Sequence, residues 1–220
     1  MLIEKIKSIR PIKLLDIGCG CGEFTKELAQ YCGQVTAIDV SEKLIDRCNK
    51  ENKLPNIEYL CRDGRATGLP DKSFDCVIER DALHHMSGWE KAIDEMFRLS
   101  TKYVLIADPL DDDRSIEKHN SNEAQNLFLE LQHDAGYEHY HHIEKEVLLE
   151  YFDTRGIKYE CVIEKYDDVV EFDEYFDRYE YFAERTQRKD YWMNRLNEFK
   201  AKLTGGKLCA EDEINIFCEV

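Results

Sequence analysis

Apolar and polar positions follow two different periods along the first half of the chain. Short runs of mostly apolar residues, typical of buried strands, alternate with longer stretches in which apolar residues recur every three or four positions, as on one face of a helix. The strand-like runs lie at residues 12–17, 34–40, 57–61, 74–78 and 103–107, and the helix-like stretches lie at 22–32, 42–53 and 87–99. This alternation predicts an α/β fold: a doubly wound, mainly parallel sheet with helices on both faces.

Local signals mark where several of these helices begin and end. Phe24, Leu28 and Tyr31 share one side of the first helix, and Gly33 stands where a helix stops. Ser41 is expected to cap the second helix. The stretch 87–90, with Ser first and Glu fourth, reads as a capping box at the start of the third helix.

The pattern becomes less regular after residue 109. Residues 111–142 are polar, with helical stretches near 124–131, and residues 145–152 form another helical pattern. Residues 157–165 and 214–220 look like strands, whereas 171–203 carry aromatic residues at the spacing of one long helix or a pair. We expect a single domain over residues 1–220, in which 110–145 and 167–210 are helical cap or lid insertions.

The aromatic segment 172–192 has two interpretations. Aromatic residues at helical spacing usually pack a core, but an amphipathic helix inserted before the last strand could also cover the mouth of an active site. Tyr175, Tyr179 and Tyr181 are the candidates for lining such a mouth.

Candidate chemistry gathers at the ends of the first three predicted strands. The first strand runs into Asp16 and then into Gly18, Gly20 and Gly22, and glycines at this spacing allow a tight turn that brings a ligand against bare main chain. Asp39 ends the second strand and Asp63 follows the third. Because ligands of open α/β sheets bind at the carboxyl ends of strands, we expect these residues to lie together.

Three segments of residues 10–109 resemble the class I S-adenosylmethionine-dependent methyltransferases, in particular the small-molecule enzymes of ubiquinone-pathway type. They are residues 15–22 (LDIGCGCG), 69–75 (LPDKSFD) and 81–86 (DALHHM). The resemblance implies a Rossmann-like seven-stranded sheet and S-adenosylmethionine as the cofactor.

It also implies roles for individual residues. The backbone at Gly18 and Gly20 is expected to bind the methionine part, with Asp16 orienting its amino group, and Asp39 is expected to hold the ribose. Val40 would pack on the adenine, Asp63 and Gly64 would contact the adenine edge, and the main chain at Glu79 would touch the methionine part. The complete set of expected cofactor-binding residues is Asp16, Gly18, Cys19, Gly20, Gly22, Asp39, Val40, Asp63, Gly64 and Glu79. The charged pair Glu79-Arg80 departs from the small or apolar residues that the family more often has there.

A nicotinamide-dependent dehydrogenase is the competing nucleotide-binding class. Such enzymes favour glycines spaced G-x-G-x-x-G, whereas residues 18–22 of this chain read G-x-G-x-G. No tyrosine in the chain is followed four residues later by a lysine, so the base of short-chain dehydrogenases is absent as well.

Methyl transfer from a sulfonium needs alignment more than it needs a base, because the leaving group is already activated. His84 and His85, just after the fourth strand, are the catalytic candidates, either as a base or as a hydrogen-bonding strut. Asp81 with these histidines could also face a metal, but hard cations prefer oxygen ligands and we expect no metal site. A second group, residues 139–142 (HYHH), is interpreted as a solvent-facing loop, with substrate contact as the alternative.

The charge distribution restricts the partners. The formal net charge is −16, and residues 107–185 carry 23 acidic against 8 basic side chains. Nucleic acid is an unsuitable partner because phosphates are bound by clusters of Lys and Arg. The acidic block is either a solvated surface or a field that attracts a cationic or amine-bearing substrate.

The chain contains no apolar run long enough to span a bilayer and no signal peptide, so we expect a cytoplasmic protein without membrane contact. Its nine cysteines are expected to be reduced structural thiols. The expected function is methyl transfer from S-adenosylmethionine to a small molecule by direct displacement. The alternatives are an inactive methyltransferase-like binding module that acts through a protein partner, and a protein methyltransferase.

Overall fold

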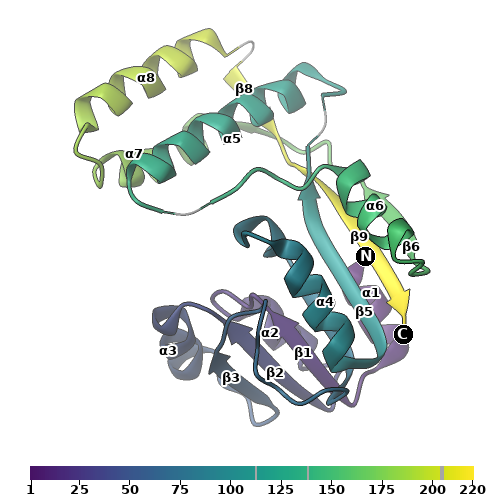
Figure 1. Cartoon of the computed structure of the whole chain (residues 1–220). Coiled ribbons are helices and arrows are strands. Elements are labelled where there is room, and N and C mark those ends of the chain that lie inside the picture. Colours follow the sequence, from purple (N-terminus) through teal and green to yellow (C-terminus); the bar gives the residue numbers. More distant parts are fainter. Residues whose placement is uncertain (112, 138, 204–205) are drawn as a thin grey trace. The chain divides into compact units, whose positions relative to one another are not determined.

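The chain forms two compact units, each with its own buried core. The computed structural model describes residues 1–111, 113–137, 139–203 and 206–220. The sheet unit comprises Met1–Asp108, Lys145–Glu164 and Ile214–Val220, and the helical unit comprises Pro109–Glu144 and Lys165–Glu213. Figure 1 shows the elements of both units coloured along the sequence.

A seven-stranded sheet organises the sheet unit, with the strand order β3-β2-β1-β4-β5-β9-β6 (Figure 1). Its strands are β1 (Lys13–Ile17), β2 (Gln34–Asp39), β3 (Ile57–Cys61), β4 (Phe74–Arg80), β5 (Ser100–Leu110), β6 (Glu160–Glu164) and β9 (Asp212–Glu219). β1 pairs in parallel with β2 on one side and with β4 on the other, and parallel pairing continues to β3 and to β5. The predicted α/β class with a mainly parallel sheet is confirmed.

The strand order reverses between β1 and β4. The chain builds β2 and β3 outward from one edge of β1 and then returns to its other edge with β4. At such a point the loops that follow the two central strands run in opposite directions, which leaves a crevice at their carboxyl ends. The sheet therefore positions the loops after β1 and β4 around one potential binding site.

Helices cover both faces of this sheet. They are α1 (Leu2–Ile9), α2 (Glu23–Leu28), α3 (Glu42–Glu51), the 3₁₀ turn η1 (Leu83–His85), α4 (Trp89–Leu99) and α6 (Lys145–Thr154). Neighbouring strand residues such as Leu14 and Leu15 point to opposite faces, yet both are fully buried. Burial on both faces explains why the strands read as continuous apolar runs in the sequence.

Several helix boundaries differ from the predicted ones. Ser41 does cap α3 and accepts a hydrogen bond from the Leu44 amide at 3.4 Å. The capping box predicted over residues 87–90 is wrong, because α4 starts at Trp89 after Gly88, whose φ of 71° is left-handed and which forms no side-chain cap. Helix α1, which the sequence analysis did not predict, buries two apolar side chains near the start of the chain.

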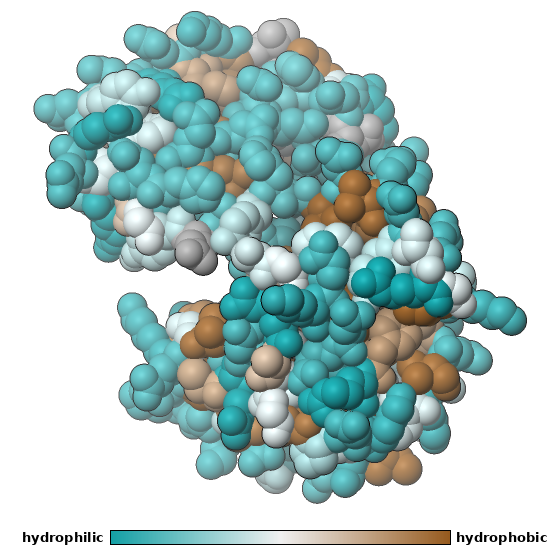
Figure 2. Space-filling view, in the orientation of Figure 1, coloured by the Kyte–Doolittle hydropathy of each residue, from teal (hydrophilic) through white to brown (hydrophobic). Residues whose placement is uncertain are grey.

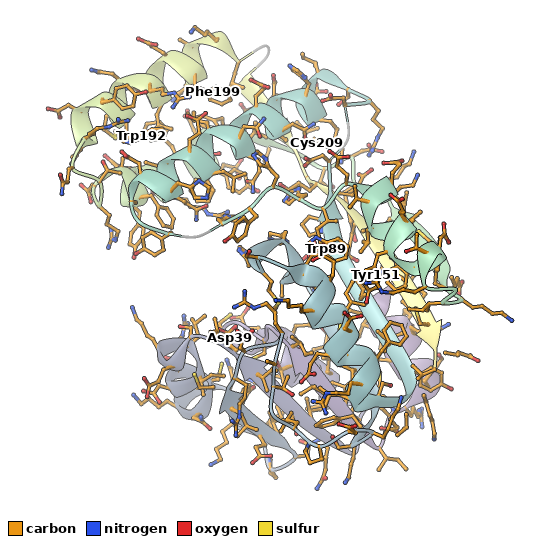
Figure 3. All side chains as sticks on the ribbon, in the orientation of Figure 1. Asp39, Trp89, Tyr151, Trp192, Phe199 and Cys209 are labelled. Atoms are coloured by element: carbon orange, nitrogen blue, oxygen red, sulfur yellow. The ribbon has the colours of Figure 1, made fainter. Side chains whose placement is uncertain are left out.

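The helical unit has an aromatic core. It contains α5 (Ile116–Asp134), β7 (Val169–Glu171), α7 (Asp173–Ala183), α8 (Lys189–Lys202) and β8 (Lys207–Cys209). β7 and β8 form an antiparallel pair that the sequence analysis did not predict, and α7 and α8 lie between them in the chain. Phe128 of α5, Phe172 and Trp192 are almost completely buried. Trp192 and Phe199 of α8 are labelled in Figure 3. Much of the aromatic segment therefore packs a core, and α5 is longer than its polar sequence suggested because one side of it contributes to that core.

The two predicted cap segments lie largely in the helical unit. Residues 110–144 and 167–210 belong to it, although positions 112, 138, 204 and 205 lie outside the described residues. The role of these segments as a cap stays a prediction. Among the described helices, none is both long enough and apolar enough to cross a membrane.

The helical unit also carries most of the negative charge. Its residues include 22 acidic and 11 basic side chains, a net charge of −11 out of −16 for the chain. The side of the unit that is visible in Figure 2 is mainly hydrophilic. The acidity seen in the sequence is therefore concentrated in one folded unit.

Candidate functional site

The loop between β1 and α2 has a backbone conformation that favours glycine at three positions. Gly18, Gly20 and Gly22 all have positive φ, at 76°, 53° and 78°. A Cβ atom at Gly18 would lie 2.3 Å from the Cβ of Ala82, so the loop passes directly against the segment that follows β4. The amides of Gly18 and Cys19 donate hydrogen bonds of 2.8 and 3.0 Å to the carbonyl of Ile38 in β2. The predicted glycine turn is thus held between the ends of β2 and β4.

Asp39, at the carboxyl end of β2 (Figure 3), connects the glycine loop to the start of α3 through hydrogen bonds. Its Oδ2 accepts a hydrogen bond from the Gly20 amide at 3.0 Å, and its Oδ1 accepts one from the Ser41 amide at 2.8 Å. The neighbouring Val40 is 72% exposed, which is unusual for an aliphatic residue beside a strand. The end of β2 therefore presents a fixed carboxylate and an uncovered apolar side chain.

Asp16 is a buried acid at the end of β1. It is only 3% exposed, and its Oδ2 accepts a hydrogen bond of 2.5 Å from the Thr25 hydroxyl of α2. Burial raises the pKa of Asp16 to about 6, and the hydrogen bond from Thr25 opposes that rise. A carboxyl group in this state gains from a nearby positive charge, which would stabilise its ionised form.

A cavity of about 510 Å³ opens in front of these groups. It is lined by Asp16, Gly18, Cys19, Gly20, Cys21, Glu23, Phe24, Glu27, Arg80 and Asp81, which belong to β1, the glycine loop, α2 and the end of β4. This is the crevice expected where the strand order reverses.

Phe24 and Arg80 are among the lining residues that were not predicted as site residues. The Arg80 guanidinium lies 4.7 Å from the centroid of the Phe24 ring and 3.5 Å from a carboxylate oxygen of Asp81. Phe24 was assigned to the apolar side of its helix, and its position in the first turn after the glycine loop was the signal that could have placed it in the site. Asp81 has a φ of 53°, a strained value for a residue with a side chain, and such strain is common at functional sites.

The loop after β3 differs from the expectation in one respect. Both carboxylate oxygens of Asp63 are engaged by Arg65, at 3.0 Å from Nε and 2.8 Å from Nη2. Hydrogen bonding to Arg65 holds the pKa of Asp63 below its usual range. At Gly64, a Cβ atom would lie 2.6 Å from Ile17, so this loop packs against β1. The contact of Asp63 with adenine stays a prediction, and in it the Asp63 carboxylate would bind Arg65 and the adenine at the same time.

Glu79 turns its side chain into the protein. It is fully buried, and its Oε1 accepts hydrogen bonds from the amides of Ala82 and Leu83 at 2.8 and 3.1 Å, which fixes the turn after β4. Burial, followed by the negative charge of Asp108, raises the pKa of Glu79 well above its ordinary value. Only the main chain of Glu79 stays a predicted cofactor contact.

The two predicted catalytic histidines have different surroundings. His84 is 7% exposed, and its Nδ1 lies 3.0 Å from Oδ1 of Asp108 at the end of β5. His85 is exposed, and its ring centroid lies 4.1 Å from that of His84. An acid that holds one ring nitrogen of His84 fixes the orientation of the imidazole.

The group at residues 139–142 is not a simple solvent-facing loop, so that interpretation was wrong. His139 and His142 are 4% and 8% exposed. Nδ1 of His139 lies 2.5 Å from Oε1 of Gln132, and Nδ1 of His142 lies 2.7 Å from Oδ1 of Asp111. Both histidines are thus bound within the helical unit, where they hold the chain that follows α5.

The comparisons with known proteins agree with this geometry. Residues 15–103 match the sequence model of a family described as "Methyltransferase domain". An uncharacterized methyltransferase of Mycobacterium bovis is 32% identical over 94 residues, which cover 43% of this chain and 48% of that protein. The ubiquinone/menaquinone biosynthesis C-methyltransferase UbiE of Hydrogenovibrio crunogenus is 29% identical over 103 residues, which cover 43% of this chain and 41% of that protein. The chain thus spans about half the length of the curated relatives it matches.

Solved structures share the fold over nearly the whole chain. A cyclopropane-fatty-acyl-phospholipid synthase-like protein from Lactobacillus casei has a TM-score of 0.75 at 15% identity, with 100% of this chain and 88% of that chain covered. A SAM-dependent methyltransferase from Archaeoglobus fulgidus has a TM-score of 0.59 at 17% identity, with 100% and 90% covered.

Residues 15–103 are similar to the methyltransferase-domain family, and the whole chain shares the fold of solved structures that include a SAM-dependent methyltransferase. The resemblance seen in the sequence motifs is therefore confirmed.

Proposed function

We propose that this chain transfers a methyl group from S-adenosylmethionine to a small-molecule acceptor. The observation that carries the proposal is the cavity of about 510 Å³ at the switch between β1 and β4, bordered by the glycine loop and Asp16 in a matched methyltransferase domain. When bound, S-adenosylmethionine supplies a methyl group activated by a positively charged sulfur.

The residues around the cavity suit such a molecule. The turn at Gly18 and Gly20 offers bare main chain to the methionine part, and Asp16, poised near pH 6, suits its ammonium group. Asp39 already accepts hydrogen bonds from two backbone amides, and its remaining oxygen lone pairs can accept hydrogen bonds from the ribose hydroxyls. The exposed Val40 would lie against the adenine, with Asp63 and Gly64 at its edge.

We propose a direct in-line displacement. A lone pair of the acceptor attacks the methyl carbon as the carbon–sulfur bond breaks, and the bonding electrons remain on the sulfur. The chain mainly aligns the reactants, which can supply about 7–11 kcal/mol of the barrier reduction. His84, oriented by Asp108, and the exposed His85 are the candidates for removing a proton from an acceptor or for positioning it.

The substrate is proposed to carry an amine or a positive charge. The helical unit, with a net charge of −11, creates a negative potential that raises the local concentration of cations. The same acidity argues against nucleic acid as the substrate. A cytoplasmic location is supported by the nine cysteines, all of which are free thiols.

Two measurements test the cofactor and the transfer. Calorimetry should detect binding of S-adenosylhomocysteine, and Asp39→Asn should weaken it about 10- to 100-fold, the effect of losing charged hydrogen bonds of 1.5–3 kcal/mol. Asp46→Asn on the exposed side of α3 is the matched control and should leave the affinity unchanged.

Incubation with methyl-labelled S-adenosylmethionine and a cell extract then identifies the kind of acceptor. Label in the small-molecule fraction supports the proposal. Label confined to protein would assign a protein acceptor instead, and cofactor binding without any transfer would indicate an inactive binding module. A chiral labelled methyl group should reach the product with inverted configuration, and retention would contradict a single in-line displacement.

A further inference from the structure

The helical unit contains a cavity of its own, of about 320 Å³, between α5, α7 and the β7–β8 strand pair. Small-molecule sites begin at about 300 Å³, so the cavity can hold a compact ligand. Every residue that lines it belongs to the helical unit. It shares no lining residue with the cavity at the glycine loop.

The inner wall of this cavity is apolar. It includes Ala124 and Phe128 of α5 and Leu208 of β8, which are 2%, 1% and 7% exposed. The hydrogen bonds between Ser121 of α5 and the backbone of Cys209 in β8, both 2.8 Å long, hold these walls together. Cys209 is labelled in Figure 3. A small hydrocarbon or aromatic group fits such a wall.

Two opposite charges, Arg178 and Glu211, also line the cavity. The Arg178 guanidinium lies 4.3 Å from the centroid of the Phe128 ring, and no carboxylate among the residues that the structure describes lies within ion-pairing distance of it. The Glu211 carboxylate is 40% exposed, and one of its oxygens lies 3.9 Å from Nε2 of His142. Arg178 therefore has its fork of N–H donors available to a carboxylate, which it binds in a bidentate manner.

Tyr179 lines the same cavity as both charges. Its hydroxyl donates to the carbonyl of Ala124 at 3.0 Å. Burial raises the pKa of Tyr179, the charge of Arg178 lowers it and the charge of Glu211 raises it. One phenol thus senses the positive and the negative side chain together, with the apolar wall beside it.

The charge of the unit selects among ligands that could use Arg178. A net charge of −11 repels a simple anion, whereas a molecule with an ammonium group beside its carboxylate has no net charge. We propose that this cavity binds a small apolar α-amino acid. Its carboxylate pairs with Arg178, its ammonium group pairs with Glu211, and its side chain packs on Phe128 and Leu208.

Three probes that share a phenyl ring on a short carbon chain test each part of this proposal. L-Phenylalanine has both charged groups, 3-phenylpropionate lacks the ammonium group, and 2-phenylethylamine lacks the carboxylate. Calorimetry with the full-length protein, without any nucleotide, should rank L-phenylalanine as the tightest of the three by about tenfold or more, since one charged hydrogen bond contributes about 1.5–3 kcal/mol.

Variants assign the two charges to the two residues. Arg178→Met should weaken L-phenylalanine and 3-phenylpropionate about tenfold or more and leave 2-phenylethylamine unweakened. Glu211→Gln should weaken L-phenylalanine and 2-phenylethylamine and leave 3-phenylpropionate unweakened. Arg185→Met is the matched control: Arg185 also stacks on a ring of α7, that of Tyr181, but does not line the cavity. It should leave all three affinities unchanged.

Several results would overturn the proposal. They are the absence of binding of L-phenylalanine to the unmodified protein, equal affinity for the three probes, or an Arg178→Met variant that binds L-phenylalanine as tightly as the unmodified protein does. The proposal does not depend on methyl transfer, because S-adenosylhomocysteine binding is measured separately.

Discussion

The burial of Asp16 has a measurable cost in stability. The pKa of this carboxyl group rises from 3.8 to about 6, mainly because of burial and despite the hydrogen bond from Thr25. Above pH 6 the folded protein therefore holds a buried negative charge that the unfolded chain exposes to water. Asparagine has almost the same shape and no charge, so we predict that Asp16→Asn stabilises the protein at pH 8.

The size of the effect follows from the pKa shift. A shift from 3.8 to about 6 is roughly two units, and each unit corresponds to about 1.4 kcal/mol, so ionised Asp16 lowers the free energy of unfolding by up to about 3 kcal/mol. Because the folded-state pKa is the higher one, its favourable effect is complete below about pH 4 and is lost as the pH rises through 6. The new amide hydrogens of asparagine need partners, which costs about 1 kcal/mol, so the expected net gain at pH 8 is about 2 kcal/mol.

Urea unfolding between pH 4 and pH 8 measures this gain. The difference in unfolding free energy between Asp16→Asn and the unmodified protein should grow as the pH rises through 6. Asp46→Asn, on the exposed side of α3, controls for the loss of one surface charge and should show no such trend. A variant less stable than the unmodified protein at pH 8, or a difference that is independent of pH, would refute the reasoning.

The same substitution should have the opposite effect on cofactor binding. If ionised Asp16 pairs with the ammonium group of the cofactor, the affinity of the unmodified protein for S-adenosylhomocysteine should rise with pH up to about 6. Asp16→Asn should bind about tenfold or more weakly at pH 8 and lose this dependence. Unchanged affinity and an unchanged pH profile would remove Asp16 from the binding site.

Three further predictions concern single positions. Gly18→Ala should lower the free energy of unfolding by about 2–4 kcal/mol in urea, because its methyl group would lie 2.3 Å from the Cβ of Ala82. Gly20→Ala would have no heavy atom within 4 Å of its methyl group and should cost only about 1–2 kcal/mol for its positive φ. Equal losses would contradict this reasoning. Glu79→Gln should already be more stable than the unmodified protein at pH 7. The unfolded chain ionises at the ordinary pKa of 4.5 while the buried carboxyl group stays protonated, so the stability contributed by Glu79 is complete below that pKa and is lost as the pH rises through the raised one. A loss of stability as large as that of Glu79→Ala would argue against this assignment. Asp212→Ala should lower the free energy of unfolding by about 3–5 kcal/mol, because it leaves buried Lys118 without its carboxylate. Burial raises the pKa of Asp212, but hydrogen bonds from Arg114 and Lys118 outweigh it and bring the pKa to about 2. The stabilisation by Asp212 is therefore complete above about pH 4, and near-UV circular dichroism of the unmodified protein should show its loss as the pH falls toward 2.

Much of the sheet unit was predictable because its signals are local. Strands buried on both faces read as short apolar runs, and a turn that needs positive φ needs glycine, so residues 12–17 and the loop from Gly18 to Gly22 could be recognised without any long-range contact. The capping role of Ser41 is equally local, since the hydroxyl and the amide it binds are three residues apart. By contrast, Gly88 starts α4 through its backbone conformation, which no neighbouring side chain signals.

The sequence by itself determined the class of fold, the positions of most strands along the chain and the acids at the strand ends, because hydrophobic period and turn chemistry depend on neighbouring residues. Only the tertiary structure decided which of these acids are buried, which are bound and what they face. It buried Asp16 against Thr25, engaged Asp63 with Arg65, turned Glu79 inward and brought Arg178 and Glu211 to one cavity. These properties depend on groups that are far apart in the chain or on other elements, and the free energy of a charge is set by the three-dimensional surroundings that folding creates.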